Sequence, residues 1–178
     1  MCTDANMNPQ RTMIRQYLSA IAMLALTMIA AMPAARADAL SRGTAAYYRG
    51  DYNRAARELE PAARAGNPHA AALLGFLYEQ GFGEPQAYPA AANLYFQGAE
   101  QGDVFAQAAL GLMYDKGHGV PQDFVLAYKW LNLAAAHAYG HQRDVFQRFR
   151  DAVASKMSPD EIATGQRLAL FWVPPGFR

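Results

Sequence analysis

Residues 99–124 read AEQGDVFAQAALGLMYDKGHGVPQDF, and much of this stretch repeats a pattern found 36 residues earlier. The recurring residues include nine with a clear pattern: Gly66, Ala70, Leu74, Gly75, Tyr78, Gly81, Gly83, Pro85 and Gln86 return as Gly102, Ala106, Leu110, Gly111, Tyr114, Gly117, Gly119, Pro121 and Gln122. Self-similarity at one fixed period of this size is typical of proteins built from stacked structural units. Each unit must bury its apolar face against its neighbours, because it cannot bury that face alone.

Each repeat is predicted to hold two helices. Within residues 87–122, apolar residues follow helical spacing in two runs, first Ala91, Leu94, Tyr95 and Ala99, then Ala106, Leu110, Met113 and Tyr114. Between the runs, Gly102 is suited to the left-handed conformation that ends a helix, and Asp103 is suited to capping the next one. Because this turn is short, the two helices are expected to be antiparallel neighbours. We therefore predict an all-α fold, an α-solenoid of antiparallel helix pairs.

Two kinds of residue are unfavourable inside the predicted helices. Gly75 and Gly111 share one register in the second helices, where glycine costs about 1 kcal/mol relative to alanine. Their recurrence predicts a close helix contact that leaves no room for a side chain. Pro61 lies within a helix expected over residues 52–65, where it removes a backbone donor and collides with the preceding turn. We expect a kink or a break near Glu60.

The first 37 residues have the features of a signal peptide. Two arginines precede an apolar run over residues 17–32, and the run is followed by Pro33 and then Ala35-Arg36-Ala37. This order matches a charged region, an apolar region and a cleavage site with small residues. The alternative is an uncleaved anchor, but a membrane span needs about 20 apolar residues. We predict that residues 1–37 are removed and that the exported chain begins at Asp38.

The exported chain is expected to have three parts. Residues 38–49 are predicted as a leading helix, residues 50–157 as the repeat solenoid, and residues 158–178 as a C-terminal capping helix and tail. The solenoid holds about three units, of which the third diverges after residue 137. Ser158-Pro159-Asp160-Glu161 predicts the start of the capping helix, with a reciprocal capping box between the serine and the glutamate.

The capping helix and the tail carry several large apolar side chains. We expect the helix to turn Ile162, Leu168 and Phe171 toward the preceding hairpin. Phe171 and Trp172 are expected to cover the end of that hairpin. The alternative is that the apolar tail is a contact site for a partner, since apolar groups left exposed together mark such sites.

Composition excludes several classes of protein. The single cysteine, Cys2, lies in the predicted signal peptide, so the exported chain has no disulfide. From Asp38 onward, 13 lysines and arginines face 14 aspartates and glutamates. A nearly neutral chain without a basic stripe is not expected to bind nucleic acid. We expect a monomer without stable membrane insertion after signal cleavage, located in the periplasm of a Gram-negative bacterium, with secretion as the alternative.

The stretch that opens this section resembles the Sel1-like repeats, which are relatives of the tetratricopeptide repeats. Residues 99–124 match the family pattern Ala-x-Gln-Gly-Asp, Ala-Gln, Leu-Gly-x-Met-Tyr, Gly-x-Gly-Val and Pro-Gln-Asp-Phe. The earlier copy departs from it at Asn67, Ala71 and Glu84. The resemblance implies a right-handed solenoid that acts as a non-catalytic adaptor or regulator in the bacterial cell envelope. It implies no catalytic residues, because the family shares none.

The sequence holds no strong signal for chemistry. His137 and His141 have a spacing that suits a metal on one helical face, but Gly140 between them predicts a helix boundary. There is no nucleophile elbow and no phosphate-binding loop. We therefore predict no enzyme activity, no catalytic or metal site and no cofactor. The alternative is a cell-wall-associated enzyme or a binder of peptidoglycan fragments, for which Glu58 and Glu60 are the carboxylates to test.

A protein partner is expected on the concave face, which the first helices of successive units line in such stacks. Equivalent positions 36 residues apart then form rows along this face. The predicted partner-binding residues are one row of Arg57, Asn93 and Lys129, a second row of Glu60, Phe96 and Asn132, and the neighbouring Gln97. These side chains can hydrogen-bond an extended peptide or pack against a helix. The alternative is that they are ordinary solvated polar positions.

Overall fold

The computed structural model describes residues 38–174, and every regular element in that range is a helix. Residues 38–48 are helical, and seven further helices follow: α2 (Tyr52–Arg64), α3 (Pro68–Gln80), α4 (Tyr88–Glu100), α5 (Val104–Lys116), α6 (Phe124–His137), α7 (Gly140–Ala154) and α8 (Pro159–Leu170). These helices belong to one compact unit that begins at Ala39. The predicted signal peptide, residues 1–37, lies outside the described residues.

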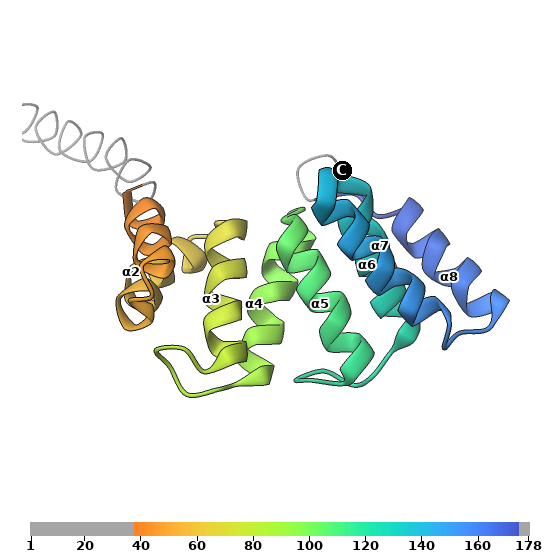
Figure 1. Cartoon of the computed structure of the whole chain (residues 1–178), viewed down its shortest axis with the longest axis horizontal. Coiled ribbons are helices and arrows are strands. Elements are labelled where there is room, and N and C mark those ends of the chain that lie inside the picture. The colour runs from red at the N-terminus through yellow and green to blue at the C-terminus, as the bar shows by residue number, and fades with distance from the viewer. Residues whose placement is uncertain (1–37, 175–178) are drawn as a thin grey trace, which may run out of the picture. The chain divides into compact units, whose positions relative to one another are not determined.

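The helices pack as antiparallel pairs that stack one after another (Figure 1). The pairs are α2 with α3, α4 with α5, and α6 with α7. The second helix of each pair also packs on the first helix of the next, so α3 contacts α4 and α5 contacts α6. Helix α8 packs on α6 at the C-terminal end of the stack. The predicted all-α stack of helix pairs is confirmed.

The turns within the first two pairs form as their sequences predict. Gly66 and Gly102 both have positive φ, 86° and 87°, which an L side chain rarely adopts. The next residue caps the following helix in each case. Asn67 Oδ1 accepts a hydrogen bond from the amide of Ala70 at 2.9 Å, and Asp103 Oδ1 accepts one from Ala106 at 2.8 Å. These caps satisfy amides that the first turn of a helix leaves without partners.

The glycines at equivalent positions in α3 and α5 allow close helix contacts. A methyl group on Gly75 would lie 3.0 Å from the ring of Tyr95 in α4. A methyl group on Gly111 would lie 2.8 Å from Cγ of Leu131 in α6 and 3.1 Å from the carbonyl oxygen of Ala127. Both contacts join one pair to the next. The close helix contact predicted from their recurrence is confirmed.

The core is rich in alanine and forms three clusters, each of which draws residues from neighbouring units. Its largest fully buried side chains include Trp130, Tyr95 and Leu59. Tyr95 buries its ring between α3, α4 and α5, and its hydroxyl donates a hydrogen bond to Glu79 Oε2 at 2.8 Å. Burial, the charge of Glu79 and this hydrogen bond together raise the pKa of Tyr95 far above its ordinary value. The hydroxyl therefore stays protonated.

The break that Pro61 was expected to cause near Glu60 is absent, so this part of the prediction is wrong. Helix α2 runs without interruption from Tyr52 to Arg64 with Pro61 inside it. The proline ring lies on the exposed side, one turn before the end of the helix, where few hydrogen bonds remain to be disrupted. Buried Leu59, Ala62 and Ala63 hold the backbone against α3 on both sides of the proline.

Helix α8 begins as predicted but presents a different face. The capping box between Ser158 and Glu161 is present. The residues that α8 buries are the small Gly165 and Ala169, whereas Leu168 is 42% exposed and Phe171 77% exposed. A methyl group on Gly165 would lie 2.9 Å from the ring of Tyr128 in α6, so the two helices approach through the small residues. The predicted inward position of Leu168 and Phe171 is therefore wrong.

Candidate functional site

Two of the predicted partner-binding residues are exposed and uncommitted. Arg57 on α2 and Asn93 on α4 occupy equivalent positions in successive first helices, and both are exposed. Within residues 38–174, neither side chain has a hydrogen bond or an ion pair with another described residue. Their polar groups are therefore open to a ligand.

Three other predicted residues already have partners inside the protein. Glu60 forms an ion pair with Arg64 one turn later on α2, at 2.6 Å. Gln97 donates a hydrogen bond from Nε2 to the carbonyl oxygen of Ala63 at 2.7 Å. Because this carbonyl lies at the C-terminal end of α2, Gln97 ties α4 to the preceding pair. Glu60 and Gln97 therefore make polar contacts within the protein.

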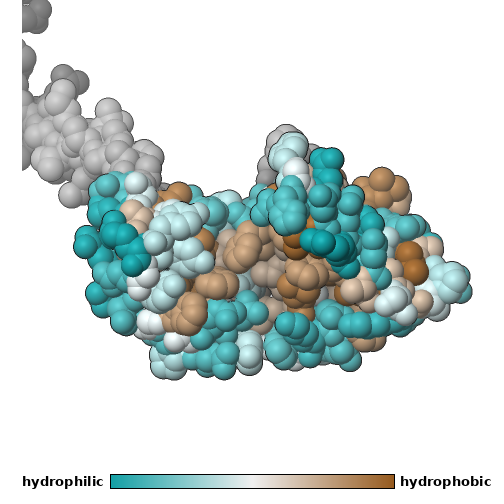
Figure 2. Space-filling view, viewed as in Figure 1, coloured by the Kyte–Doolittle hydropathy of each residue, from teal (hydrophilic) through white to brown (hydrophobic). Residues whose placement is uncertain are grey.

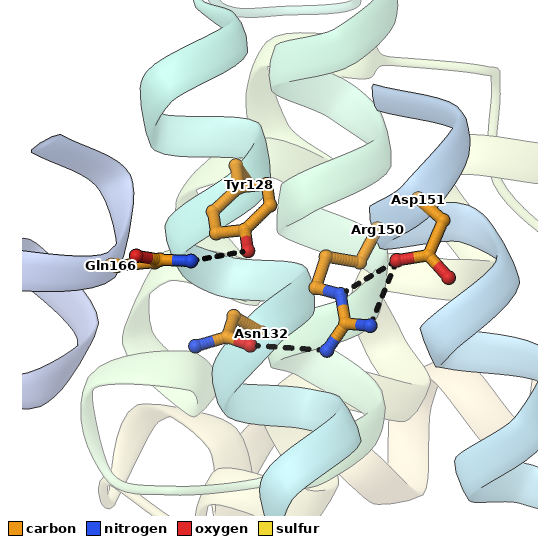
Figure 3. A network of polar contacts seen from close by, with 5 residues as sticks. All are labelled: Tyr128, Asn132, Arg150, Asp151 and Gln166. Atoms are coloured by element: carbon orange, nitrogen blue, oxygen red, sulfur yellow. Dashed lines mark hydrogen bonds and ion pairs between the residues drawn. The ribbon is translucent and has the colours of Figure 1, made fainter. Parts of the chain in front are cut away.

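Asn132 belongs to a polar network between the last helices (Figure 3). Its Oδ1 accepts a hydrogen bond from Arg150 of α7 at 3.4 Å, and the two side chains point toward one another in Figure 3. Arg150 also contacts Asp151 Oδ1, at 2.8 Å from its Nη2. On the other side of α6, Gln166 of α8 donates to the hydroxyl of Tyr128 at 3.4 Å. Asn132 is thereby directed toward α7.

The remaining two predicted residues meet at an aromatic cluster, which we define as Phe96, Trp130 and Trp172. Phe96 is 49% exposed on α4, and its ring centroid lies 6.4 Å from that of Trp130 on α6. The ammonium group of Lys129 lies 3.8 Å from the centroid of the Trp130 ring, a cation–π contact. Trp172 follows α8 and approaches Trp130 edge to face at 6.2 Å. The cluster joins three segments that are distant in the sequence.

Trp172 packs on α6 and reaches the turn between α4 and α5. Its ring centroid lies 6.2 Å from that of His137. A methyl group on Gly102 would lie 3.8 Å from Cη2 of Trp172. Its indole N–H is buried and donates to no acceptor within the described residues. The prediction that Phe171 and Trp172 together cover the last hairpin is therefore wrong for Phe171, which is exposed, and incomplete for Trp172, which also reaches the preceding pair.

A cavity of about 420 Å³ lies beside the aromatic cluster, and it is lined by Glu100, Lys129, Thr164, Arg167, Leu168, Phe171 and Trp172. Burial lowers the pKa of Lys129, and the negative charge of Glu100 opposes that shift. Arg167 donates a hydrogen bond from its guanidinium group to the hydroxyl of Thr164 at 2.9 Å. The cavity thus combines two cations, one carboxylate and an apolar wall.

Sequence reasoning missed most of this cavity. Of its lining residues, Lys129 was among the predicted groove positions, and Phe171 and Trp172 belong to the tail that was the alternative contact site. Glu100 stands one helical turn after Phe96 on α4, a relation that the sequence does contain. Arg167 and Trp172 could not be placed, because their side of the cavity depends on how α8 packs on α6. No periodicity extends from the repeats into that helix.

A second apolar surface lies over α3, α4 and α5, in the middle of the face shown in Figure 2. Half-buried Phe76 of α3 and Phe105 of α5 contribute rings whose centroids are 6.2 Å apart. Tyr47 continues this series toward the N-terminal side, 5.9 Å from Phe76. Phe76 and Phe105 also pack against the core cluster that contains Tyr95 and Trp130, and Tyr47 packs against the cluster that contains Leu59.

The other titratable residues that the sequence singled out lie outside the cavity. Glu58 pairs with Arg42 at 2.8 Å and with Arg54 at 3.9 Å on the surface of α2. His137 ends α6 and His141 lies in α7, so the two imidazoles are on different helices. Among residues 38–174, no group of three or more His, Cys, Asp or Glu side chains could hold a metal ion.

The helices of the described range are also unsuited to a membrane span. None of those within residues 38–174 combines the length and the apolar character that crossing a bilayer requires.

Comparison with known proteins identifies the repeats. The profile of the Sel1 repeat matches residues 68–103 and 104–139. One similar solved structure is c5321, a protective antigen present in uropathogenic Escherichia coli strains that displays an SLR fold. It is 24% identical, with a TM-score of 0.70, and the match covers 77% of this chain and 29% of that one. A Sel1 repeat protein from Oxalobacter formigenes is 28% identical, with a TM-score of 0.59, over 73% of this chain and 54% of that one.

This chain therefore spans about a third and about half of the lengths of those two proteins. No curated protein matches the sequence.

Proposed function

Because this chain is a Sel1-repeat protein, and such repeats typically mediate protein interactions, we propose that it is a non-catalytic adaptor or regulator. Its partner is a peptide or a protein segment that lies across the first helices α2, α4 and α6. The surface it contacts is defined by Arg57, Asn93, Phe96 and Lys129, and is called the groove face below. The protein works by holding this partner rather than by transforming it.

The observation that carries this proposal is the exposed edge of the aromatic cluster. Phe96 is 49% exposed, although its ring packs against Trp130. An aromatic side chain held rigidly by the core and left half open supplies contact area at a low cost in conformational entropy. Aromatic side chains are enriched at the centres of protein interfaces for this reason.

Polar groups next to Phe96 supply the directional contacts. Asn93 lies one turn before Phe96 on α4, and Arg57 occupies the equivalent position on α2. Both are exposed and have no hydrogen-bond partner among the described residues. An extended segment on this face can pair its backbone with these side chains, while an apolar side chain contacts Phe96.

The place of action is proposed from the N-terminal sequence. Residues 1–37 have the order of charged, apolar and small residues that is typical of a secretory signal peptide. We propose export to the periplasm, where the chain from Asp38 onward acts in the cell envelope. Fractionation of cells that express the full chain tests this point. A product of the full length in the cytoplasmic fraction would contradict export.

The binding proposal is tested by affinity capture with the chain from residue 38 onward. Captured proteins from envelope extracts are identified, purified and titrated against the bait and against the triple variant Arg57→Ala, Asn93→Ala, Phe96→Ala. Arg148→Ala is the matched control, because Arg148 is exposed on α7. The proposal predicts that binding is lost in the triple variant and retained in the control. It is wrong if no protein binds at micromolar concentration, or if both variants bind equally.

A further inference from the structure

We propose that the cavity between α4, α6 and α8 is a carboxylate-binding site, which receives a carboxylate of the bound peptide between Lys129 and Arg167 and an adjacent apolar side chain against Phe171 and Trp172. This inference deepens the proposed function, on which it rests for the assumption that the ligand is a peptide.

The charge balance of the cavity favours an anionic ligand. Lys129 and Arg167 bring two cations to its wall, whereas Glu100 is the single carboxylate among its lining residues. Within the described range, neither cation forms an ion pair with a carboxylate. The guanidinium group of Arg167 donates only to the hydroxyl of Thr164 there, so most of its five donors remain available. A second carboxylate, supplied by a ligand, would balance the charge of this arrangement.

Lys129 is held in place and partly removed from water. Its ammonium group lies over the ring of Trp130, and burial lowers its pKa. A charge that has already lost part of its hydration gains more from a new anion than a fully solvated lysine does. Its position over the ring also reduces the side-chain entropy lost on binding.

The apolar wall of the cavity favours a ligand with an apolar side chain beside its carboxylate. Leu168 is 42% exposed and Phe171 77% exposed, although both line a cavity of about 420 Å³. Apolar groups that border a pocket with convergent polar groups are typical of ligand sites. Because the wall stands beside the cations, the ligand that fits best carries its carboxylate next to an apolar side chain. Either a C-terminal residue or an acidic residue beside an apolar one has this chemistry.

The position of the cavity connects it to the groove face. Glu100 on its wall lies one helical turn after Phe96 on α4, and Lys129 belongs to both surfaces. A segment that contacts Phe96 can therefore continue into the cavity. The cavity is closed by α8 and the residues after it, which are not part of the two matched repeats. It is accordingly a feature of this chain's C-terminal end.

Tryptophan fluorescence gives a direct test, because the chain has two tryptophans and both belong to the aromatic cluster. The full chain is titrated with N-acetyl-Gly-Gly-Phe as the free acid, with the same peptide as the amide, and with N-acetyl-Gly-Asp-Phe-Gly amide. We expect saturable binding of at least one carboxylate peptide, and binding of the tripeptide amide weaker by about tenfold or more. The first peptide reports a C-terminal carboxylate and the third a side-chain carboxylate.

Three variants complete the test. Arg167→Gln is expected to weaken binding of the carboxylate peptide about tenfold. The substitution leaves the core intact because Arg167 is exposed. Lys129→Gln is expected to act in the same direction. Arg148→Gln, the control on α7, is expected to bind normally. The proposal is overturned if the amide binds as tightly as the acids, if neither carboxylate peptide binds at millimolar concentration, or if Arg167→Gln binds normally.

Failure here is distinguishable from failure of the proposed function. If affinity capture yields a partner that depends on Phe96 but the peptides do not discriminate by carboxylate, the adaptor role stands and the carboxylate site is wrong. If carboxylate peptides bind and Arg167→Gln weakens them, while no protein partner is captured, the site stands and the adaptor role is wrong.

Discussion

Trp172 meets Trp130 edge to face, with ring centroids 6.2 Å apart and planes at 72°. This contact joins the segment after α8 to buried Trp130 of α6, and it packs Trp172 against a core cluster. Aromatic pairs in this geometry contribute about 0.5–1.5 kcal/mol beyond the area that they bury. The C-terminal segment is therefore a structural element as well as a wall of the candidate site.

Replacing Trp172 tests this structural role. Trp172→Ala is expected to lower the free energy of unfolding by about 2 kcal/mol, because a partly buried aromatic side chain and its ring contact are lost. Part of the loss is offset, since the buried indole N–H has no acceptor among the described residues. Urea unfolding measures the change. Phe171→Ala is the matched control, expected within about 0.5 kcal/mol of the parent because Phe171 is 77% exposed.

Gly111 lies at the contact between the second and third pairs, where helix propensity and packing predict opposite changes in stability on mutation to alanine. By helix propensity alone, Gly111→Ala stabilises α5 by about 1 kcal/mol. We expect a loss of about 2 kcal/mol instead, because the new methyl group would lie 2.8 Å from Leu131 Cγ and 3.1 Å from a backbone oxygen. Thermal or urea unfolding decides between the two. An increase in stability would show that the helices are not held this closely.

Two residues four apart on α4 are expected to behave differently when changed to alanine. Gln97→Ala removes the hydrogen bond to the carbonyl of Ala63 and is expected to cost about 1 kcal/mol of folding stability. Asn93→Ala removes no internal hydrogen bond and is expected within about 0.5 kcal/mol of the parent. Equal losses would contradict the division of this face into a structural residue and a free one. Urea unfolding of both variants provides the comparison.

The buried hydroxyl of Tyr95 predicts a dependence of stability on alkaline pH. An unfolded tyrosine ionises near its model value of 10.0, whereas the folded-state pKa of Tyr95 is raised by burial and by Glu79. The stabilisation is thus complete below pH 10 and declines above it, by about 1.4 kcal/mol per pH unit for one proton. Tyr95→Phe is expected to reduce this slope in urea unfolding between neutral and alkaline pH. An unchanged slope would assign the effect to other groups.

The repeat pattern predicted the helix pairs because the same local chemistry recurs in both copies. Gly102 and Asp103 act within one turn, so their roles follow from neighbouring residues alone. The recurrence of Gly75 and Gly111 was informative for a different reason, since a residue unfavourable in a helix at one fixed register indicates a contact. Nothing in that reasoning requires the positions of other segments.

The residues that were misplaced depend on how whole helices pack. Leu168 was expected inside, but Gly165 allows α8 to approach Tyr128 closely and thereby turns Leu168 outward. The break expected at Pro61 is absent because buried neighbours on both sides hold α2 in place. Asn132 was assigned to the groove by its register, yet the third pair diverges and brings Arg150 of α7 to it. Such contacts arise between segments that no periodicity relates.

The central claim is that a partner lies on the first helices, along the groove face. Amide hydrogen exchange of the chain, with and without its captured partner, tests it most directly. We expect slower exchange in α2 (Tyr52–Arg64), α4 (Tyr88–Glu100) and α6 (Phe124–His137) in the complex, and unchanged exchange in α3 (Pro68–Gln80) and α5 (Val104–Lys116). Protection confined to α3 and α5 would contradict the claim and would assign binding to the apolar surface around Phe76 and Phe105.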